Sequence, residues 1–283
     1  RSLTESLQNI SNIPMFIAID AEGGQVNRLK PENGFLEIPS HKELGMLPLE
    51  DVQVHSESLA NQLRGVGINV NFAPVIDVDI NPDNPIIGLL GRSFSSDPDI
   101  VTKQASAYID GHRKYGIITS PKHFPGHGSA AGDTHKGVVD VTNVYNQKEL
   151  EPFRDLVSLG KVDALMSAHI INKNVDSIYP ASLSRKHIEE ILRNDIGFDG
   201  VVFSDDIDMG AIKNEFSLKE SLVLAINAGV DIIVSSNNVT GYNPDRAGEI
   251  HRTIMKALNS GEIPVSRIIE SNGRIVKLKE SLK

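Results

Sequence analysis

The sequence predicts an α/β fold built around a parallel sheet. Short apolar runs alternate with amphipathic segments along the chain, and glycine residues stop several of the amphipathic segments. Such alternation is the sequence form of successive βαβ units, in which helices cover a parallel sheet. A third observation bears on function, because nearly every apolar run ends on a polar or ionisable residue.

The predicted strands are continuous apolar runs, as expected of strands that are covered on both faces. We predict six, at residues 15–19, 68–76, 117–120, 164–168, 201–204 and 231–235. Their carboxyl ends carry Asp20, Asp77, Lys122, His169, Asp205, and Ser236 with Asn237. An ordering of this kind is hard to explain by packing alone.

The predicted helices lie between these strands. They cover residues 3–10, 49–64, 97–115, 146–159, 184–194 and 218–227, and two more close the chain. The helix at 97–115 has the clearest boundaries, because Asp97 is a good cap, Pro98 suits the first helical position and Gly116 ends the segment.

Six strands do not close a barrel of eight. The residues alone therefore leave two folds open: a (β/α)8 barrel with two elements before Arg1, or an open, doubly wound sheet. In a barrel the carboxyl ends of the strands form one rim, where loop residues converge on a single pocket.

Composition excludes several classes of function. The chain has 28 basic and 37 acidic residues and a net charge of -9, which argues against general nucleic-acid binding. The absence of cysteine excludes thiol nucleophiles and zinc sites built on cysteine. No apolar run approaches the length that spans a bilayer, so we predict no membrane span. Because residue 1 is arginine, we expect a processed or trimmed chain.

The segment 122–135 is predicted to be a catalytic loop. It holds Lys122, three histidines and Asp133, and Pro125 with its neighbouring glycines favours a fixed turn. An imidazole such as His135 can act as acid and as base near neutrality, and a carboxylate two residues away can orient it. The histidines could also be imagined as metal ligands, but His123 and His127 flank a Pro-Gly break and need not share a face, so we predict no metal.

The chain resembles glycoside hydrolase family 3, and within it the single-domain β-N-acetylglucosaminidases. The matching segments extend along the whole chain, at residues 19–29, 71–77, 91–94, 122–135, 166–169 and 203–209. The Asp-x-His at the end of the loop is the signature of this subgroup. The sequence departs from the common pattern in residues 135–139, where many relatives have a proline, and at Gln25, where arginine is usual.

The resemblance implies a (β/α)8 TIM-type barrel that lacks its first one or two strands, with residues 1–283 as a single domain. It implies a retaining exo-β-N-acetylglucosaminidase, a β-hexosaminidase that removes terminal GlcNAc from peptidoglycan or chitin fragments, as in bacterial cell-wall recycling. The alternatives are a phosphorylase or a β-glucosidase of the same family, or an inactive sugar-binding protein. The last would have no reason to retain Asp205 together with Asp133 and His135.

The resemblance also assigns roles to residues. It makes Asp205 the nucleophile, His135 the acid/base and Asp133 the partner of His135. It places sugar-binding positions on Asp20, Arg28, Arg92, Lys122 and His123. From its strand-end position we add His169 as part of the pocket wall, with a satisfied buried histidine as the alternative.

Other polar residues receive plainer interpretations. Asp20 and Arg28 are equally well explained as a structural salt bridge, and we interpret Glu22 as structural. We expect the remaining histidines outside the loop, at positions 41, 55, 112, 187 and 251, to lie on the surface. A small carbohydrate is the expected binding partner, with no cofactor. We expect a monomer in the cytoplasm, with the periplasm or secretion as alternatives.

Overall fold

A computed structural model describes residues 1–239 and 241–282. The helices are α1 (Ser2–Asn9), α2 (His41–Leu44), α3 (Leu49–Gly65), α4 (Pro98–Arg113), α5 (Glu151–Ser158), α6 (Gly210–Lys213), α7 (Leu218–Ala228), α8 (Arg246–Asn259) and α9 (Val265–Glu280). Shorter 3-10 turns are η1 (Pro31–Asn33), η2 (Gln147–Leu150) and η3 (Ala181–Leu183), and η4 (Lys186–Asp195) is a π-helix. The strands are β1 (Ala18–Ile19), β2 (Ala21–Gly23), β3 (Val26–Asn27), β4 (Val70–Asn71), β5 (Ile118–Thr119), β6 (Val139–Asp140), β7 (Ala164–Ser167), β8 (Ile170–Ile171), β9 (Val201–Asp206) and β10 (Ile232–Val234).

Six of these strands form a parallel array whose spatial order follows the chain. Two parallel sheets have the orders β1-β4-β5 and β10-β9-β7. The residues that follow β5 join the two sheets, because Phe124 N–H donates to the Met166 carbonyl at 2.9 Å and Met166 N–H donates to the Pro121 carbonyl at 3.0 Å. A doubly wound sheet would reverse its order at a switch point, and this array does not.

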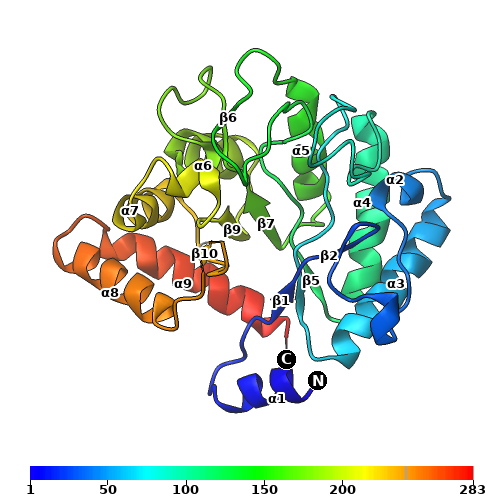
Figure 1. Cartoon of the computed structure of the whole chain (residues 1–283), viewed down its shortest axis with the longest axis horizontal. Coiled ribbons are helices and arrows are strands. Elements are labelled where there is room, and N and C mark those ends of the chain that lie inside the picture. Colours follow the sequence, from blue (N-terminus) through cyan, green and yellow to red (C-terminus); the bar gives the residue numbers. More distant parts are fainter. Residues whose placement is uncertain (240, 283) are drawn as a thin grey trace.

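The array is therefore a mixed α/β domain of the barrel-like kind, with helices on the outside of the strands (Figure 1). It is open: within the part of the chain that the structure describes, no hydrogen-bonded ladder joins β10 to β1. The six predicted strands are all present, although most are shorter than predicted. The short pairs β2-β3 and β6-β8 were not predicted from the sequence.

Local signals place the helices as expected. The Asp97 side chain accepts a hydrogen bond from Asp99 N–H at 3.0 Å, and Pro98 is the first residue of α4. Helix α7 begins with a capping box between Ser217 and Glu220 and ends at Gly229, whose φ of 113° favours glycine. These caps fix where α4 and α7 begin.

Helix α9 contributes to the interior of the strand array. Its residue Leu278 packs in a buried cluster with side chains from β4, β5, β7 and β9, namely Val70, Ile118, Ala164, Met166, Val201 and Phe203. In Figure 1 the end of this helix approaches the open side of the array, near β1. Apolar side chains of α9 thus cover part of the core on the side where no hydrogen-bonded ladder among the described residues joins β10 to β1.

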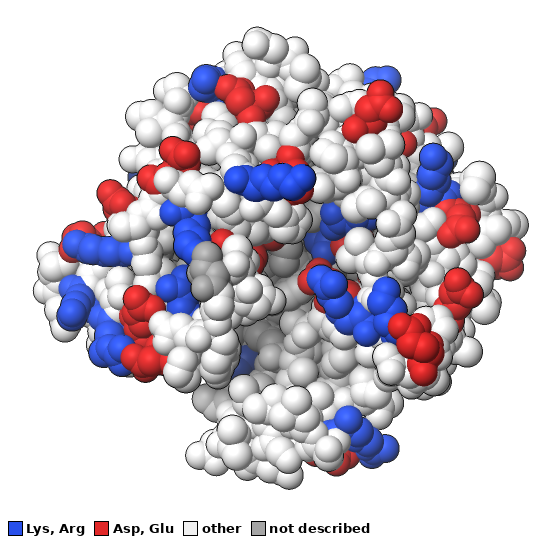
Figure 2. Space-filling model, in the orientation of Figure 1, with Lys and Arg blue, Asp and Glu red and all other residues white. Residues whose placement is uncertain are grey.

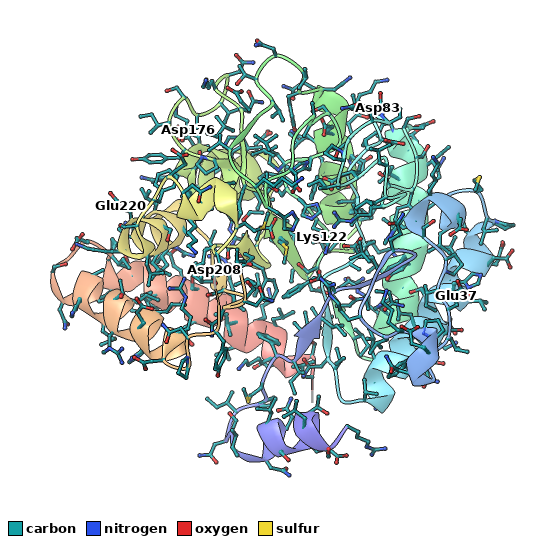
Figure 3. The ribbon with its side chains drawn as sticks, in the orientation of Figure 1. Glu37, Asp83, Lys122, Asp176, Asp208 and Glu220 are labelled. Carbon is teal, nitrogen blue, oxygen red and sulfur yellow. The ribbon has the colours of Figure 1, made fainter. Side chains whose placement is uncertain are left out.

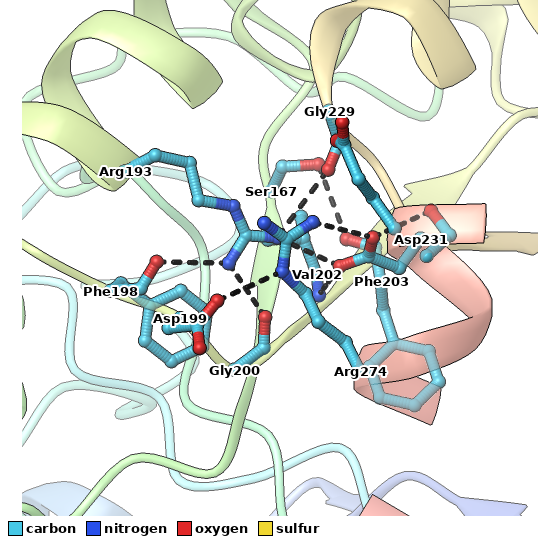
Figure 4. A network of polar contacts seen from close by, with 12 residues as sticks. Ser167, Arg193, Phe198, Asp199, Gly200, Val202, Phe203, Gly229, Asp231 and Arg274 are labelled. Carbon is cyan, nitrogen blue, oxygen red and sulfur yellow. Dashed lines mark hydrogen bonds and ion pairs between the residues drawn. The ribbon is translucent and has the colours of Figure 1, made fainter. Parts of the chain in front are cut away.

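A buried aspartate ties α9 to the strands (Figure 4). The Asp231 side chain is fully buried, and its carboxylate oxygens lie 2.7 Å from Nη2 of Arg193 and 2.7 Å from Nη2 of Arg267. Arg274 lies 3.4 Å away, and Val202 N–H donates to the same carboxylate at 3.0 Å. Full pairing of this kind offsets much of the cost of burying a carboxylate.

The surface prediction is wrong for three histidines. His41, His112 and His187 are buried, with at most 1% of each residue exposed. His112 shows why: Ser56 Oγ lies 2.7 Å from its Nδ1 and Asn71 Nδ2 lies 3.0 Å from its Nε2. Those partners come from α3 and β4, so neighbouring residues in the sequence gave no sign of them.

Candidate active site

A cavity of about 670 Å³ lies where the carboxyl ends of the parallel strands meet. Figure 2 shows a hollow near the centre of this face with acidic and basic side chains around it, and Figure 3 places Lys122 there. Its ionisable lining residues come from distant parts of the chain and are Asp20, Glu22, Arg28, Arg92, Lys122, His123, His127, His135, Asp205 and Asp206. The prediction that strand ends converge on one pocket is confirmed for Asp20, Lys122 and Asp205.

One wall of the cavity is a cluster of alternating charges. Lys122 is 2% exposed, and its Nζ lies 2.7 Å from Asp20 Oδ1 and 2.7 Å from Glu22 Oε1. Arg92 forms two hydrogen bonds of 2.8 Å with the Glu22 carboxylate. Burial alone would raise the pKa of Glu22, but Arg92 and Lys122 hold that pKa far below its usual range. Glu22 is therefore ionised and organises two cations at the cavity wall.

Glu22, interpreted from the sequence as structural, does have a structural role, because its buried carboxylate holds Arg92 and Lys122. It is also part of the cavity lining, which the sequence interpretation did not include. A signal was available, since residues two apart in an extended segment point to the same side, and Asp20 and Glu22 are two apart. The salt bridge considered between Asp20 and Arg28 does not occur among the described residues; Asp20 pairs with Lys122, and Arg28 is an exposed residue of the cavity lining.

His123 is held from behind by a buried carboxylate. Its Nδ1 lies 2.7 Å from Asp77 Oδ2, while Asp77 Oδ1 accepts the backbone N–H groups of His123 and His127 at 3.1 and 2.8 Å. Burial of Asp77 would raise its pKa, but the adjacent His123 lowers the pKa below the ordinary value. Asp77 was recognised in the sequence only as a strand-end residue.

Asp205 occupies the end of β9 and faces the cavity. Its Oδ1 accepts the backbone N–H of Asp206 at 2.8 Å. Burial opposes ionisation, but His169, His123 and Lys122 together lower the pKa of Asp205 below its usual value. The carboxylate is thus charged at neutral pH. The neighbouring Asp206 Oδ1 instead accepts N–H groups of Asp208 and Ser236, which fixes the turn after the strand.

His135 and Asp133 meet on the exposed rim of the same cavity. The Asp133 Oδ1 lies 2.8 Å from Nδ1 of His135 and also accepts the His135 backbone N–H at 3.0 Å. Of the two side chains, His135 is 63% exposed and Asp133 18%. The loop is fastened to α6, because Gly210 N–H donates to the His135 carbonyl at 3.1 Å. A side chain at Gly210 would collide with the loop backbone at 2.6 Å.

His169 does not line the cavity, contrary to its assignment as a substrate-binding wall residue. It is fully buried, its Nε2 lies 3.0 Å from the Asp206 carbonyl and its Nδ1 lies 2.6 Å from Ser182 Oγ. Because a carbonyl can only accept, Nε2 carries the proton and Nδ1 accepts from the hydroxyl. Burial lowers the pKa of His169, whose ring lies close to Asp205 behind the cavity wall.

His127 lines the cavity, but neither of its ring nitrogens has a hydrogen-bond partner among the described residues. Burial lowers the pKa of His127 to about 4, so the ring is neutral. Within the described chain, no group of three or more histidine, aspartate or glutamate side chains is placed to hold a metal ion. The imagined ligand set at residues 123, 127, 133 and 135 is not brought together.

An ionised Asp205, an exposed imidazole with a carboxylate partner, and a barrel-like rim are the features expected of a site of the glycoside hydrolase type. The model for the glycosyl hydrolase family 3 N terminal domain matches residues 2–278. The chain belongs to glycoside hydrolase family 3, which confirms the resemblance drawn from the sequence motifs.

The similar proteins carry related names. A β-hexosaminidase from Tolumonas auensis is 37% identical over 246 residues, which cover 85% of this chain and 72% of that protein. The β-hexosaminidase LpqI of Mycobacterium tuberculosis is 35% identical over 98% of this chain and 71% of its own. The solved structure of a family 3 β-N-acetylglucosaminidase from a Paenibacillus species superposes with a TM-score of 0.91 at 35% identity, over 99% of this chain.

The chain is shorter than these proteins. It spans 53% of the Paenibacillus structure and 50% of β-hexosaminidase A from Pseudoalteromonas piscicida, to which it is 32% identical. Among the described residues, no helix combines the length and the apolar character that crossing a membrane requires.

Proposed function

We propose that this chain is a retaining exo-β-N-acetylglucosaminidase that removes terminal β-linked GlcNAc from peptidoglycan or chitin fragments. The observation that carries the proposal is that an ionised Asp205 and a His135 held by Asp133 line one cavity of about 670 Å³. The β-hexosaminidase names of the relatives support the same substrate class.

In the first step, a carboxylate oxygen of Asp205 attacks the anomeric carbon of the terminal sugar. The bond from that carbon to the leaving oxygen breaks, and His135 gives its proton to the leaving oxygen. The product is a glycosyl ester on Asp205 and a free aglycone. The low pKa of Asp205 suits a group that must be a carboxylate before it attacks.

In the second step, water attacks the same carbon. His135, now neutral, takes a proton from the water, and the ester bond to Asp205 breaks with return of the electron pair to the carboxylate. The exposure of His135 supports this double role, because the acid needs access first to a leaving group and then to water. The Asp133 carboxylate stabilises the charged form of the imidazole, which is present before the first step and forms again when His135 takes the proton from water.

The charged wall is suited to hold the sugar. Lys122 and Arg92 keep unused N–H donors near the cavity while Glu22 and Asp20 fix their positions, and His123 adds a further polar atom. Such fixed charged groups hydrogen-bond hydroxyls strongly. Arg28, exposed at the rim, is the least constrained of the proposed sugar-binding residues.

We also infer that the six parallel strands correspond to part of a (β/α)8 barrel and that residues 1–283 form one domain. The chain-ordered array and the external helices support this inference. The monomeric state and the cytoplasmic location stay predictions from the sequence.

The experiment compares release of an aryl leaving group from an aryl β-GlcNAc and from the matching aryl β-glucoside, with and without phosphate. Release from the GlcNAc substrate, unaffected by phosphate, supports the proposal. Asp205→Ala should lose at least about 1000-fold in kcat, and added azide should restore release and yield the α-glycosyl azide. Asp51→Ala, on the exposed side of α3, is the control and should retain activity. Near-normal turnover by a folded Asp205→Ala protein would exclude the assigned role.

A further inference from the structure

The cavity holds a second carboxylate and imidazole pair, besides Asp133 and His135. In both pairs the carboxylate faces Nδ1 of the histidine, at 2.7 Å for Asp77 with His123 and 2.8 Å for Asp133 with His135. The surroundings differ: the side chain of His123 is 8% exposed and that of Asp77 is fully buried, whereas His135 is 63% exposed. A buried, fully held ring is suited to a fixed hydrogen bond, and an exposed one to proton exchange.

The neighbours of His123 determine which ring nitrogen carries the proton. Asp77, kept ionised beside His123, can only accept, so Nδ1 must donate to it. On the other side, Nη2 of Arg92 lies 3.5 Å from Nε2 of His123, and a guanidinium can only donate. Nε2 therefore presents its lone pair. Arg92 cannot turn away, because Glu22 and the Ile86 carbonyl hold its other nitrogens.

We propose that Asp77 is a positioning residue for the reaction: it fixes His123 as the tautomer with its proton on Nδ1, so that Nε2 is an acceptor. In the free protein the lone pair of Nε2 faces Arg92 at the long distance of 3.5 Å, and a hydroxyl of the bound terminal sugar takes over this hydrogen bond. The part about the sugar rests on the proposed function. The part about the tautomer depends only on the contacts of Asp77, His123 and Arg92 in the free protein.

The two oxygens of Asp77 have separate tasks, and this makes an asparagine variant informative. Oδ1 accepts two backbone N–H groups, from His123 and His127, so only an oxygen fits there. In Asp77→Asn the amide oxygen must take this position, which leaves the amide NH2 facing Nδ1 of His123. The loop keeps its backbone hydrogen bonds, but Nδ1 must now accept and Nε2 must carry the proton. That proton would point toward Arg92 and toward the sugar hydroxyl's hydrogen.

The first test is nitrogen NMR of the unliganded protein labelled with 15N-histidine, with the His123 signals identified by their loss in His123→Ala. Wild-type protein should show His123 protonated at Nδ1 and unprotonated at Nε2, and Asp77→Asn should show the reverse. Asp79→Asn, which removes a carboxylate two residues away whose charged neighbour is Lys42, should leave the wild-type pattern. A wild-type His123 protonated at Nε2 would overturn the proposal, whether or not the variant folds.

The second test is kinetic and uses the aryl β-GlcNAc. Asp77→Asn should lower kcat/KM by about 10- to 100-fold, the usual effect of replacing an acceptor by a donor opposite a bound hydroxyl. In a His123→Ala background the same change should cost less than about 2-fold, because Asp77 acts through His123. An equal loss in both backgrounds would show a merely structural role. Absence of turnover in the wild type would refute the proposed function, while the NMR result would still decide the tautomer.

Discussion

Asp133 holds His135 by two contacts from a single oxygen. Its Oδ1 lies 2.8 Å from the ring Nδ1 and accepts the backbone N–H of the same residue at 3.0 Å. The imidazole therefore has a fixed direction although 63% of the side chain is exposed, and its Nε2 is placed to face the leaving oxygen of a bound substrate. Orientation by a short local contact, together with access, is what a general acid requires.

Removal of the His135 imidazole is expected to slow the hydrolysis of some substrates more than that of others. In His135→Ala, kcat/KM should fall by about 100- to 10000-fold for aryl β-GlcNAc substrates with poor leaving groups and much less for good ones, which need little protonation. The measurement is a plot of log kcat/KM against the pKa of the leaving phenol, which should become steeper. His251→Ala, an exposed histidine of α8 outside the cavity, should keep the wild-type slope. Parallel losses across the series would contradict the role.

Glu22 is expected to matter for both binding and stability. Glu22→Gln removes the buried anion between Arg92 and Lys122, whose Nζ would keep only Asp20 as a charged partner. Breaking a buried ion pair should lower the free energy of unfolding by about 3–5 kcal/mol. Displacement of the Arg92 and Lys122 side chains should raise KM by about 10-fold or more. Urea unfolding and Michaelis constants provide the measurement. Glu32→Gln, on the exposed turn η1, is the matched control; equal effects of the two substitutions would refute the assignment.

The free energy of unfolding should depend on the ionisation of Glu149, whose side chain holds the loop at residues 122–135. This buried carboxyl accepts Ser129 N–H at 3.1 Å, and burial raises the pKa of Glu149 from 4.5 to about 7. A folded pKa above the unfolded one means that the folded state binds more protons between these values, so stability falls as pH rises from 4.5 through 7. At about 1.4 kcal/mol per pH unit, the loss is on the order of 3 kcal/mol.

Glu149→Gln should remove that part of the pH dependence. The free energy of unfolding, measured in urea at pH 5 and pH 8, should fall between the two by about 2–3 kcal/mol more in the wild type than in the variant. In the variant, Asn146 N–H loses the carboxylate oxygen that accepts its hydrogen bond at 3.3 Å. This loss lowers the stability of the variant equally at both pH values and so cancels in the comparison. Identical pH profiles would show that Glu149 does not titrate in this range.

The Asp231 network should stabilise the fold without touching the reaction. Asp231→Asn leaves Arg193, Arg267 and Arg274 close together around a neutral group, which should cost about 3–5 kcal/mol in the free energy of unfolding. The Michaelis constant of the folded variant should not change, because Asp231 does not line the cavity. Asp199→Asn removes a 76% exposed partner of Arg274 and should cost less than about 1 kcal/mol. A raised KM in Asp231→Asn would contradict this separation.

Some features were readable from the sequence because they are local. Alternation of apolar runs with capped helices predicted the six parallel strands, and Asp97 with Pro98 marked the start of α4 correctly. Asp133 and His135 are two residues apart, so their pairing could be predicted from spacing. Family membership followed from motifs spread along the whole chain.

Other features depend on which distant segments meet. Lys122 and Asp20 are 102 positions apart, and Asp77 and His123 are 46 apart, so no local spacing relates them. His169 has the same strand-end position as Lys122, yet its ring lies behind the cavity wall, bound to Ser182 and Asp206. The kind of fold and the residue types at the strand ends follow from the sequence alone. Which of these residues are buried, which are paired and which are charged depends on the folded chain, because desolvation and Coulomb interactions depend on distances across the fold.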